Sequence, residues 1–435
     1  MRILQLTPAV EKNLLRARHE RDREAEAVAA RIIADVRKRG DSALFAFTKQ
    51  FDRMDLRREG LWISTKNAGR LPRRGAARLR PISAQSLDSS SSVSPAFLRA
   101  IAEAARNIRA VAQKQLPRPW SLQTEPGVTI RQLVSPLDTV GCYIPGGNFA
   151  LGSTLLMTAI PAQVAGVKNI IVVCPKPNAA LLAAADFLGI PQIAQIGGAQ
   201  AIAALAHGTR SIPRVEKICG PGNRFVTAAK QLVSSDCAID LPAGPTEAIV
   251  LASSGNPAYI AADLLAQAEH AADAASFLVT PSKKLARAVQ EQVASQLTQL
   301  AASNPAHQSI QKSGAILLTT SLAQACDFVN RFAPEHLSLP AQPEQLLKKI
   351  TASGTIFLGP WAAQPLGDYV SGSNHVLPTG GWARKRAGLS SADFVKCITT
   401  QTVSRNGFQR LAAAAESLAE SEGLLAHRNA VRIRR

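Results

Sequence analysis

The chain has 435 residues, of which 46% are hydrophobic and 5% aromatic. This length exceeds what one hydrophobic core usually supports, and the scarcity of aromatic residues favours helix-rich α/β layers over a β-sandwich. No apolar run is long enough to cross a membrane, and the charged N-terminal region lacks the apolar segment of a signal peptide. We therefore expect a cytoplasmic protein with two main lobes.

The net charge of +19 is unevenly distributed. Excess Lys and Arg are concentrated in residues 1–40, 53–80 and 381–435, whereas residues 81–380 are nearly neutral. Basic flanks without interleaved aromatic residues more often form a solvated surface than a nucleic-acid groove, so we expect no nucleic-acid and no membrane partner. A basic nucleic-acid-binding protein on an enzyme scaffold is the competing interpretation.

Cysteine usage indicates a reducing compartment. The six cysteines are scattered without a close pair, which fits neither a zinc–thiolate site nor a disulfide framework. They are Cys142, Cys174, Cys219, Cys237, Cys326 and Cys397.

Apolar periodicity predicts the helices of the N-terminal part. Apolar residues recur at helical spacing over residues 24–39 until Gly40, and a second helix is expected from Asp41. Residues 53–92 lack this periodicity, are strongly basic and end in a run of serines, so we expect an irregular insertion. Helical periodicity returns over residues 94–114.

Beyond Pro117 the pattern becomes strand, Gly/Pro turn and helix, repeated. Such alternation predicts parallel, doubly wound sheets. The expected strands form two series, residues 139–144, 169–174, 193–196 and 217–219, and then residues 248–252, 276–280, 314–319 and 354–358.

The expected fold is therefore α/β, with two Rossmann-like lobes, each an incomplete doubly wound parallel sheet, and small helical tails at both ends. The expected division is a tail over residues 1–24, a first lobe over 25–138 and 246–380, a second lobe over 139–245, and a C-terminal helical tail over 381–435.

Glu335 and His336 follow Pro334 and place a carboxylate and an imidazole side by side in one expected loop. These groups can move protons on and off a carbon–oxygen centre near neutral pH. A solvated turn is the alternative interpretation of the same dipeptide.

A second candidate site suits a metal ion. Residues 256–270 are expected to form an amphipathic helix in which Gln267 and His270 share a face and could meet one cation. Asp368 and His427 are candidates for further ligands, although the sequence alone does not bring them together. An amide oxygen, a carboxylate and two imidazoles suit zinc, with manganese or cobalt as substitutes. An exposed helix end is the competing interpretation.

Three glycine-rich turns, over residues 143–148, 197–200 and 220–223, each follow an expected strand and precede an expected helix. Backbone N–H groups at such turns suit phosphates, and open sheets bind ligands at the carboxyl ends of their strands. None of the turns matches the dinucleotide fingerprint, so ordinary tight turns are the alternative. His375 and Glu422 lie near candidate ligands in the sequence and could equally be surface residues.

Taken together, these stretches resemble the histidinol dehydrogenase family. The matching blocks are Ile239 to Glu247, Ala262 to Leu265, Gln267 to His270, Ala333 to Leu337, Ser371 to Thr379 and the three glycine turns. The resemblance covers residues 25–52 and about 95 to the end.

The resemblance implies oxidation of L-histidinol through L-histidinaldehyde to L-histidine, with two NAD molecules each accepting one hydride and one zinc ion per subunit. It also implies a homodimer in which the C-terminal tail completes the partner's site. The catalytic pair corresponds to Glu335 and His336. The zinc ligands correspond to Gln267, His270, Asp368 and His427. The substrate contacts correspond to Thr246, Gln267, His270, Glu335, Asp368, His375, Glu422 and His427. The NAD contacts correspond to Tyr143, Gln200 and Asn223.

Three stretches depart from the family pattern. The basic residues 65–92 replace a shorter acidic segment, Ala271-Ala272 replace a Gly-Pro, and the basic residues 384–387 replace smaller side chains near the site. A diverged or inactive relative that binds another amino alcohol is therefore the alternative interpretation. Every matched ligand and catalytic position is filled, which favours the enzyme.

Overall fold

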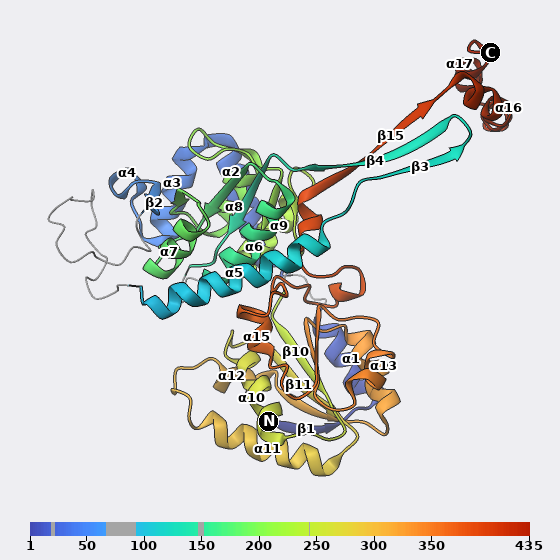
Figure 1. The fold of residues 1–435 in the computed structure, drawn as a ribbon. Coiled ribbons are helices and arrows are strands. Elements are labelled where there is room, and N and C mark those ends of the chain that lie inside the picture. Colours follow the sequence, from blue (N-terminus) through green and yellow to red (C-terminus); the bar gives the residue numbers. More distant parts are fainter. Residues whose placement is uncertain (19–21, 67–92, 147–151, 243) are drawn as a thin grey trace.

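The computed structural model describes residues 1–18, 22–66, 93–146, 152–242 and 244–435. Two α/β lobes lie next to each other, and a long arm projects from them to a pair of C-terminal helices (Figure 1). The expected fold class of two mainly parallel Rossmann-like sheets is confirmed. Within the described ranges, no helix is both long and apolar enough to span a bilayer.

The first lobe is built on an entirely parallel sheet of six strands. The chain enters its centre at β10 and adds strands first on one side and then on the other, so the strand order reverses between β10 and β13. In spatial order the strands are β1 (Arg2–Gln5), β12 (Ala315–Leu318), β11 (Ala275–Thr280), β10 (Glu247–Leu251), β13 (His336–Leu339) and β14 (Thr355–Leu358).

Helices cover both faces of this sheet, as apolar side chains on both faces require. One face packs on α1 (Pro8–Ala17), α13 (Leu322–Phe332) and α14 (Pro343–Leu347). The other packs on α10 (Pro257–Ala268), α11 (Lys283–Leu297) and α12 (Ala306–Lys312). The short helix α15 (Gln364–Tyr369) contacts α10.

The second lobe repeats this topology. Its chain enters at β5 and the strand order reverses between β5 and β8, while β2 adds one antiparallel edge strand. In spatial order the strands are β2 (Trp62–Ser64), β7 (Gln192–Ala194), β6 (Asn169–Val173), β5 (Thr139–Tyr143), β8 (Lys217–Cys219) and β9 (Ala238–Ile239).

The helices of the second lobe again form two layers. One face packs on α5 (Pro95–Gln115), α6 (Gly152–Ala165) and α7 (Ala179–Phe187). The other packs on α2 (Arg23–Arg39), α3 (Asp41–Asp52), α8 (Gly198–His207) and α9 (Arg224–Val233). All six cysteines of the chain are free, as expected, and five of them are buried.

The observed contacts differ from the expected division of the N-terminal half. Helix α2 buries Ala29, Ile32 and Val36 against the second lobe, and α5 packs on α6, so residues 25–66 and 93–115 do not belong with residues 246–380. Conversely, the expected N-terminal tail supplies β1, the edge strand of the first sheet. Local periodicity predicted these helices correctly, but their packing partners are set by apolar surfaces far away in the sequence.

Strands β2 and β15 correct two further expectations. Residues 53–66 contain the short helix α4 (Leu56–Glu59) and strand β2, so this part of the expected insertion belongs to the second lobe, whereas residues 67–92 lie outside the described residues. The expected helical tail over 381–435 contains the short turns η1 (Trp382–Arg384) and η2 (Ser391–Phe394) and then the strand β15 (Val395–Val403). This strand is rich in β-branched residues, which favour extended backbone.

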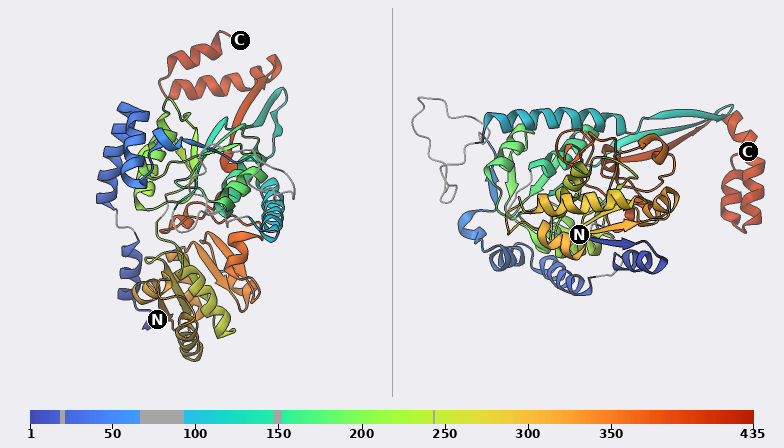
Figure 2. Two further views of the ribbon diagram at one scale, coloured as in Figure 1. Left: turned by 90° about the vertical axis from the view of Figure 1, so that its left-hand side faces the viewer. Right: turned by 90° about the horizontal axis from the view of Figure 1, so that it is seen from below.

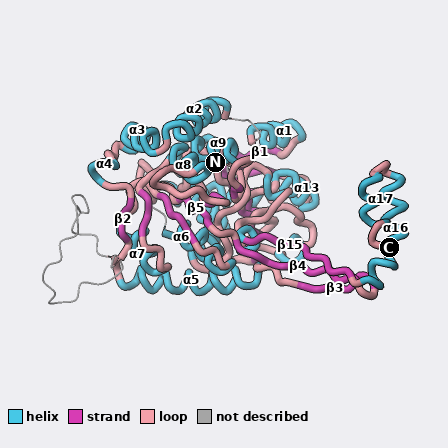
Figure 3. The backbone as a smooth tube through the Cα atoms, turned by 90° about the horizontal axis from the view of Figure 1, so that it is seen from above, coloured by secondary structure: helices cyan, strands magenta, loops and turns pink. Residues whose placement is uncertain are grey.

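The arm is a three-stranded antiparallel sheet that holds two helices away from the body (Figures 1 and 2). Its strands are β3 (Trp120–Glu125), β4 (Val128–Pro136) and β15, which pairs with β4 along its whole length. The helices at its tip are α16 (Arg405–Ser421) and α17 (Leu425–Arg432). The view in Figure 3 shows the same separation of these helices from both lobes.

A buried ion pair ties α9 to the residue that follows β9, and both partners also bond to the turn that follows β8. Lys230 pairs with Asp240, and its ammonium group also donates to the carbonyl oxygen of Gly220 at 2.8 Å. The Asp240 carboxylate accepts from the backbone N–H groups of Gly220 and Leu241, both at 2.7 Å. Both charged side chains are almost completely buried, so each depends on the other for compensation.

We expect Lys230→Met to lower the free energy of unfolding by about 3–5 kcal/mol, because it leaves the Asp240 carboxylate buried without its cation. Lys49→Met is the matched control, since the Lys49–Asp55 pair is exposed and should contribute less than about 1 kcal/mol. Urea unfolding followed by circular dichroism measures both variants. Equal losses in the two variants would contradict this account of the buried pair.

Candidate active site

Glu335 and His336 lie at the amino end of β13, next to the amino end of β10. His336 is the first residue of β13, so the expected loop ends at Glu335. One oxygen of the Glu335 carboxylate accepts from the backbone N–H of Glu247 at 3.0 Å and from the hydroxyl of Thr246. The Glu335 side chain is thereby held in one orientation at the edge of the first sheet.

The His336 imidazole lies between two carboxylates. Its Nδ1 is 3.8 Å from an oxygen of Glu335, and its Nε2 is 3.4 Å from an oxygen of Asp368. The ring of Phe357 stacks on it with centroids 5.9 Å apart. Both ring nitrogens are buried, and neither makes a hydrogen bond of normal geometry to the described residues. Such long contacts are common in catalytic sites without substrate.

Burial and neighbouring charges shift the protonation of this cluster. Burial raises the pKa of Glu335, although the nearby His336 and the hydrogen bond from Thr246 oppose this shift. Burial by itself lowers the pKa of His336, but Glu335 and Asp368 together outweigh it, so the net pKa is raised. For Asp368, burial is outweighed by the interaction with His336, and the net pKa is lowered. The imidazole is therefore well placed to hold a proton.

A chain of side-chain hydrogen bonds leads from Glu335 into the interior. Thr246 donates to Glu335 and accepts from the amide nitrogen of Gln267, and the amide oxygen of Gln267 accepts from Gln364. Gln267 is fully buried near the end of α10, and Gln364 begins α15. The chain joins the candidate general base to a candidate metal ligand.

Three of the four expected metal ligands gather near this chain. Gln267 lies on α10 and Asp368 on α15, while His270 is close enough for its charge to lower the pKa of Asp368. The sequence predicted that Gln267 and His270 share one face of a helix. This prediction is wrong, because the helix ends at Ala268 and His270 follows it. The fourth ligand, His427, lies on α17 at the tip of the arm (Figure 1).

The available donors fit a zinc ion. Among the described residues of this chain, no three His, Cys, Asp or Glu side chains form a cluster that could hold a metal. The set at this site differs from such a cluster because one donor is an amide and one is the distant His427. Together the amide oxygen, the carboxylate and the two imidazoles are a borderline-hard set that suits zinc.

His375 is held between the lobes. Its Nδ1 lies 2.8 Å from the carbonyl oxygen of Asp368, which can only accept, so Nδ1 carries a proton. Its Nε2 lies 3.2 Å from the hydroxyl of Thr154 on α6 of the second lobe. The amide of Asn374 donates to the carbonyl of Met157 on the same helix at 2.7 Å. This segment therefore connects Asp368 to the second lobe.

A cavity of about 650 Å³ lies at the carboxyl ends of the second sheet, where its strand order reverses. All three expected NAD contacts line it, namely Tyr143, Gln200 and Asn223. The structure thus brings together residues from three different turns. Part of the wall comes from α2 and from residues 51–53 around the end of α3, which the sequence did not indicate as site residues.

The polar groups of the cavity are individually positioned. The Tyr143 hydroxyl accepts from the backbone N–H of Gly198 at 3.1 Å. Gln200 donates to Asp52 at 3.2 Å, while its amide oxygen is buried without a partner among the described residues. Asn223 caps α9 by accepting from two backbone N–H groups at 3.1 Å. An unpaired buried acceptor at a helix N-terminus suits a ligand with hydroxyl and phosphate groups.

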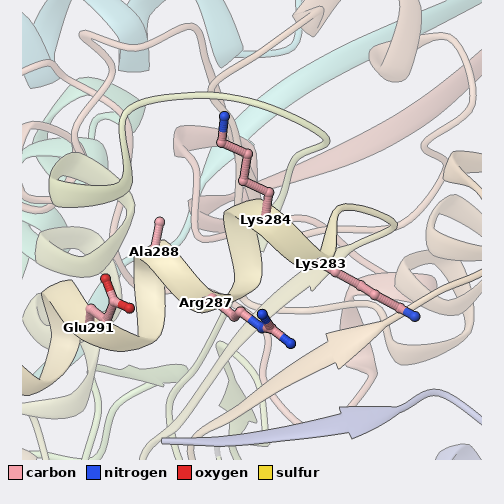
Figure 4. Close-up of a pocket in the computed structure, with 5 residues that line it drawn as sticks. All are labelled: Lys283, Lys284, Arg287, Ala288 and Glu291. Atoms are coloured by element: carbon pink, nitrogen blue, oxygen red, sulfur yellow. The ribbon is translucent and has the colours of Figure 1, made fainter.

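A second hollow, of about 430 Å³, lies along α11 on the outside of the first lobe (Figure 4). It is lined by Lys283, Lys284, Arg287, Ala288 and Glu291. None of the expected site residues borders it.

Comparison with known proteins places the chain in a family. The family model for histidinol dehydrogenase matches residues 15–435. Histidinol dehydrogenase of Aquifex aeolicus is 42% identical over 416 residues, covering 95% of this chain and 93% of the relative. That of Halalkalibacterium halodurans is 44% identical over 411 residues, covering 93% and 92%. The crystal structure of histidinol dehydrogenase from Elizabethkingia anophelis superposes with a TM-score of 0.88 at 37% identity, covering 100% of this chain and 98% of that one.

The chain belongs to the histidinol dehydrogenase family. It is therefore an oxidoreductase. The resemblance drawn from its motifs is confirmed.

Two stretches that depart from the pattern of the histidinol dehydrogenase family lie within the described residues. Arg386 donates to Asp393 at 2.8 Å, and the Asp393 carbonyl accepts from Lys217 of β8 at 2.8 Å. The basic loop is thus fastened to the second lobe. Ala271 and Ala272 lie in a turn that the bond from Ala274 N–H to the Ala271 carbonyl closes at 3.1 Å. A turn without Gly-Pro is therefore accommodated.

Proposed function

We propose that this protein is a zinc-dependent, NAD-linked histidinol dehydrogenase that oxidises L-histidinol through L-histidinaldehyde to L-histidine, the last step of histidine biosynthesis. The observation that carries the proposal is the cluster of Glu335, His336 and Asp368, held together at the amino edge of the first sheet in a chain of this family. It supplies two proton carriers and a candidate metal ligand in one place.

The residues that would hold zinc are Gln267, His270 and Asp368 of one chain and His427 of a second copy. Bound zinc would anchor the amine and imidazole of histidinol and so orient the reacting carbon. NAD bound in the cavity of the second lobe would accept one hydride in each of two steps.

His336 would take the proton of the alcohol as the hydride leaves. Its position between Glu335 and Asp368 stabilises the imidazolium that results. Glu335 would then activate the water that adds to the aldehyde before the second hydride transfer. The hydrogen bonds from Thr246 and from the Glu247 N–H keep that carboxylate oriented. Atoms therefore balance with one water consumed and two hydrides transferred.

His375 and Glu422 are proposed substrate contacts. The hydrogen bond from Nδ1 of His375 to the Asp368 carbonyl fixes the imidazole beside the metal ligands, so a substrate group could reach Nε2 by replacing the Thr154 hydroxyl. Glu422 lies at the end of α16 and is exposed, close in sequence to His427. Its contribution, like that of His427, would come from a second copy.

The proposed homodimer rests on the arm. Helix α17, which carries His427, and the end of α16 at Glu422 lie far from the lobes of their own chain, so one chain cannot complete its own site with these residues in this arrangement (Figures 1 and 2). The tail exposes apolar side chains that water solvates poorly, including Leu418, Leu425 and Ile433. Tyr369, next to Asp368 in the chain, is 55% exposed, and Trp361, in the loop before α15, is 78% exposed. Two such apolar surfaces suit burial against each other in a pair of subunits.

We expect purified protein to reduce two NAD per L-histidinol, followed as NADH absorbance, and to lose this activity on chelation and regain it with zinc. A folded, zinc-loaded dimer without activity on L-histidinol would contradict the proposal and favour the diverged relative. A panel of other amino alcohols then identifies any alternative substrate.

Glu335→Gln and His336→Gln should lower kcat by about 10²–10⁴-fold, because each removes one positioned proton carrier. The two variants should differ with L-histidinaldehyde as the substrate. Glu335→Gln would remain slow, whereas His336→Gln would recover part of the rate if its main role precedes the aldehyde. Single-turnover NADH formation from both substrates measures this difference, and identical profiles would contradict the division of roles.

Mixing two inactive variants tests whether the tail serves a second copy. His427→Ala damages the tail and Glu335→Gln damages the body. A mixed dimer has one site with both defects and one intact site, so subunit exchange should restore up to about a quarter of wild-type activity. Activity that stays at the level of the separate variants after verified exchange would show that the tail serves its own chain.

A further inference from the structure

We propose that Gln364 is a positioning residue that joins α10 to α15 and thereby fixes Gln267 and Asp368 as metal ligands. This inference rests on the proposed function, because it concerns the residues that would hold zinc. It assigns a role to two residues, Gln364 and Asp263, that belong neither to the catalytic pair nor to the ligand set.

The side chain of Gln364 makes the first half of the bridge. It is only 1% exposed, and its amide nitrogen donates to the amide oxygen of Gln267. The amide nitrogen of Gln267 in turn donates to Thr246. With its oxygen and nitrogen each engaged by a different partner, the Gln267 amide cannot turn over without losing two buried hydrogen bonds.

The backbone of Gln364 makes the second half. Burial raises the pKa of the Asp263 carboxyl on α10 to about 6, and the nearby N–H of Gln364 opposes this rise. Helix α15 has no side-chain cap of its own, because Ala363 occupies the N-cap position. The Asp263 carboxylate thus lies near the start of α15 from the neighbouring helix, where a negative charge is favoured by the free N–H groups. Both contacts of Gln364 lead to α10, one turn apart.

These bonds matter for the cation because they set donor direction. A carbonyl oxygen has two lone pairs, so Gln267 can accept from Gln364 with one and still offer the other to a metal. Asp368 lies one helical turn after Gln364, on the same side of α15. Fixing the start of α15 against α10 therefore fixes the separation of an amide ligand from a carboxylate ligand.

Zinc affinity tests the bridge without reference to turnover. Gln364→Leu removes the side-chain bond at similar volume, and Asp263→Ala removes the carboxylate near the start of α15. Loss of partners that orient ligands typically costs about 10–100-fold in metal affinity, so we expect zinc dissociation constants at least about 10-fold above wild type in both variants. Competition with a chromophoric chelator at fixed pH measures these constants with zinc alone.

Two further variants separate positioning from general stability. Asp263→Asn keeps an acceptor for the Gln364 N–H and should bind zinc within about threefold of wild type. Gln296→Leu is the matched control, because Gln296 donates to the carbonyl of Ala258 at the other end of α10 at 2.9 Å. It should lose some thermal stability but keep wild-type zinc affinity.

Each outcome has one meaning. Wild-type zinc affinity in both Gln364→Leu and Asp263→Ala overturns the bridge. An equal loss in Gln296→Leu overturns it as well, since any weakening of α10 would then suffice. If Gln364→Leu fails to fold, the contrast between Asp263→Ala and Asp263→Asn decides. Failure of the wild-type protein to bind zinc would instead overturn the proposed metal site itself.

Discussion

The parallel pairing of β10 with β13 is the constraint on which the rest of the site depends. Ala248 lies opposite His336 in the register, so Glu247 falls opposite Glu335 and the hydroxyl of Thr246, just before β10, reaches the Glu335 carboxylate. Their hydrogen bond and the bond from the Glu247 N–H follow from this register. In a strand a slip of one residue would turn His336 to the opposite face of the sheet. The positions of these side chains are therefore as well defined as the core strands that carry them.

The two sheets share one topology, but their candidate site residues lie at opposite edges of the strands. The second sheet presents its carboxyl edge to a cavity, as open α/β sheets usually do. The first sheet instead presents its amino edge, where Glu335 and His336 begin β13. Hydrogen bonds from the segment around His375 to α6 bring these edges together. In the proposed mechanism, a hydride acceptor held by the second lobe would thus meet proton carriers held by the first lobe, and neither lobe would be sufficient alone.

Local signals in the sequence predicted the helices over residues 24–39 and 94–114 to within one residue at each end, because helix caps are local. Asn178, Ser282 and Ser321, for example, each cap a helix through a bond within the same turn. Motifs also indicated the candidate residues. What the sequence could not supply was which lobe α2 and α5 join, the strand character of β15, and the end of α10 before His270. These depend on apolar surfaces and strand partners distant in the chain. Asp52 and Gln364 were missed for the same reason, since each matters only through contacts with other elements.

The strand pairing of the arm fixes both the direction in which α16 lies from the body and its distance from the body. Strand β15 matches β4 residue for residue from Val395 to Val403, so the ladder measures the distance between the body and α16 in steps of one residue. Sliding β15 by two residues would preserve which side chains face which way but would displace the tail by about 7 Å. In the proposed dimer, where His427 of the tail would bind the partner's metal, that displacement is larger than a metal–ligand bond tolerates. Insertions and deletions should therefore be excluded from the paired strands of the arm and tolerated only at its turns.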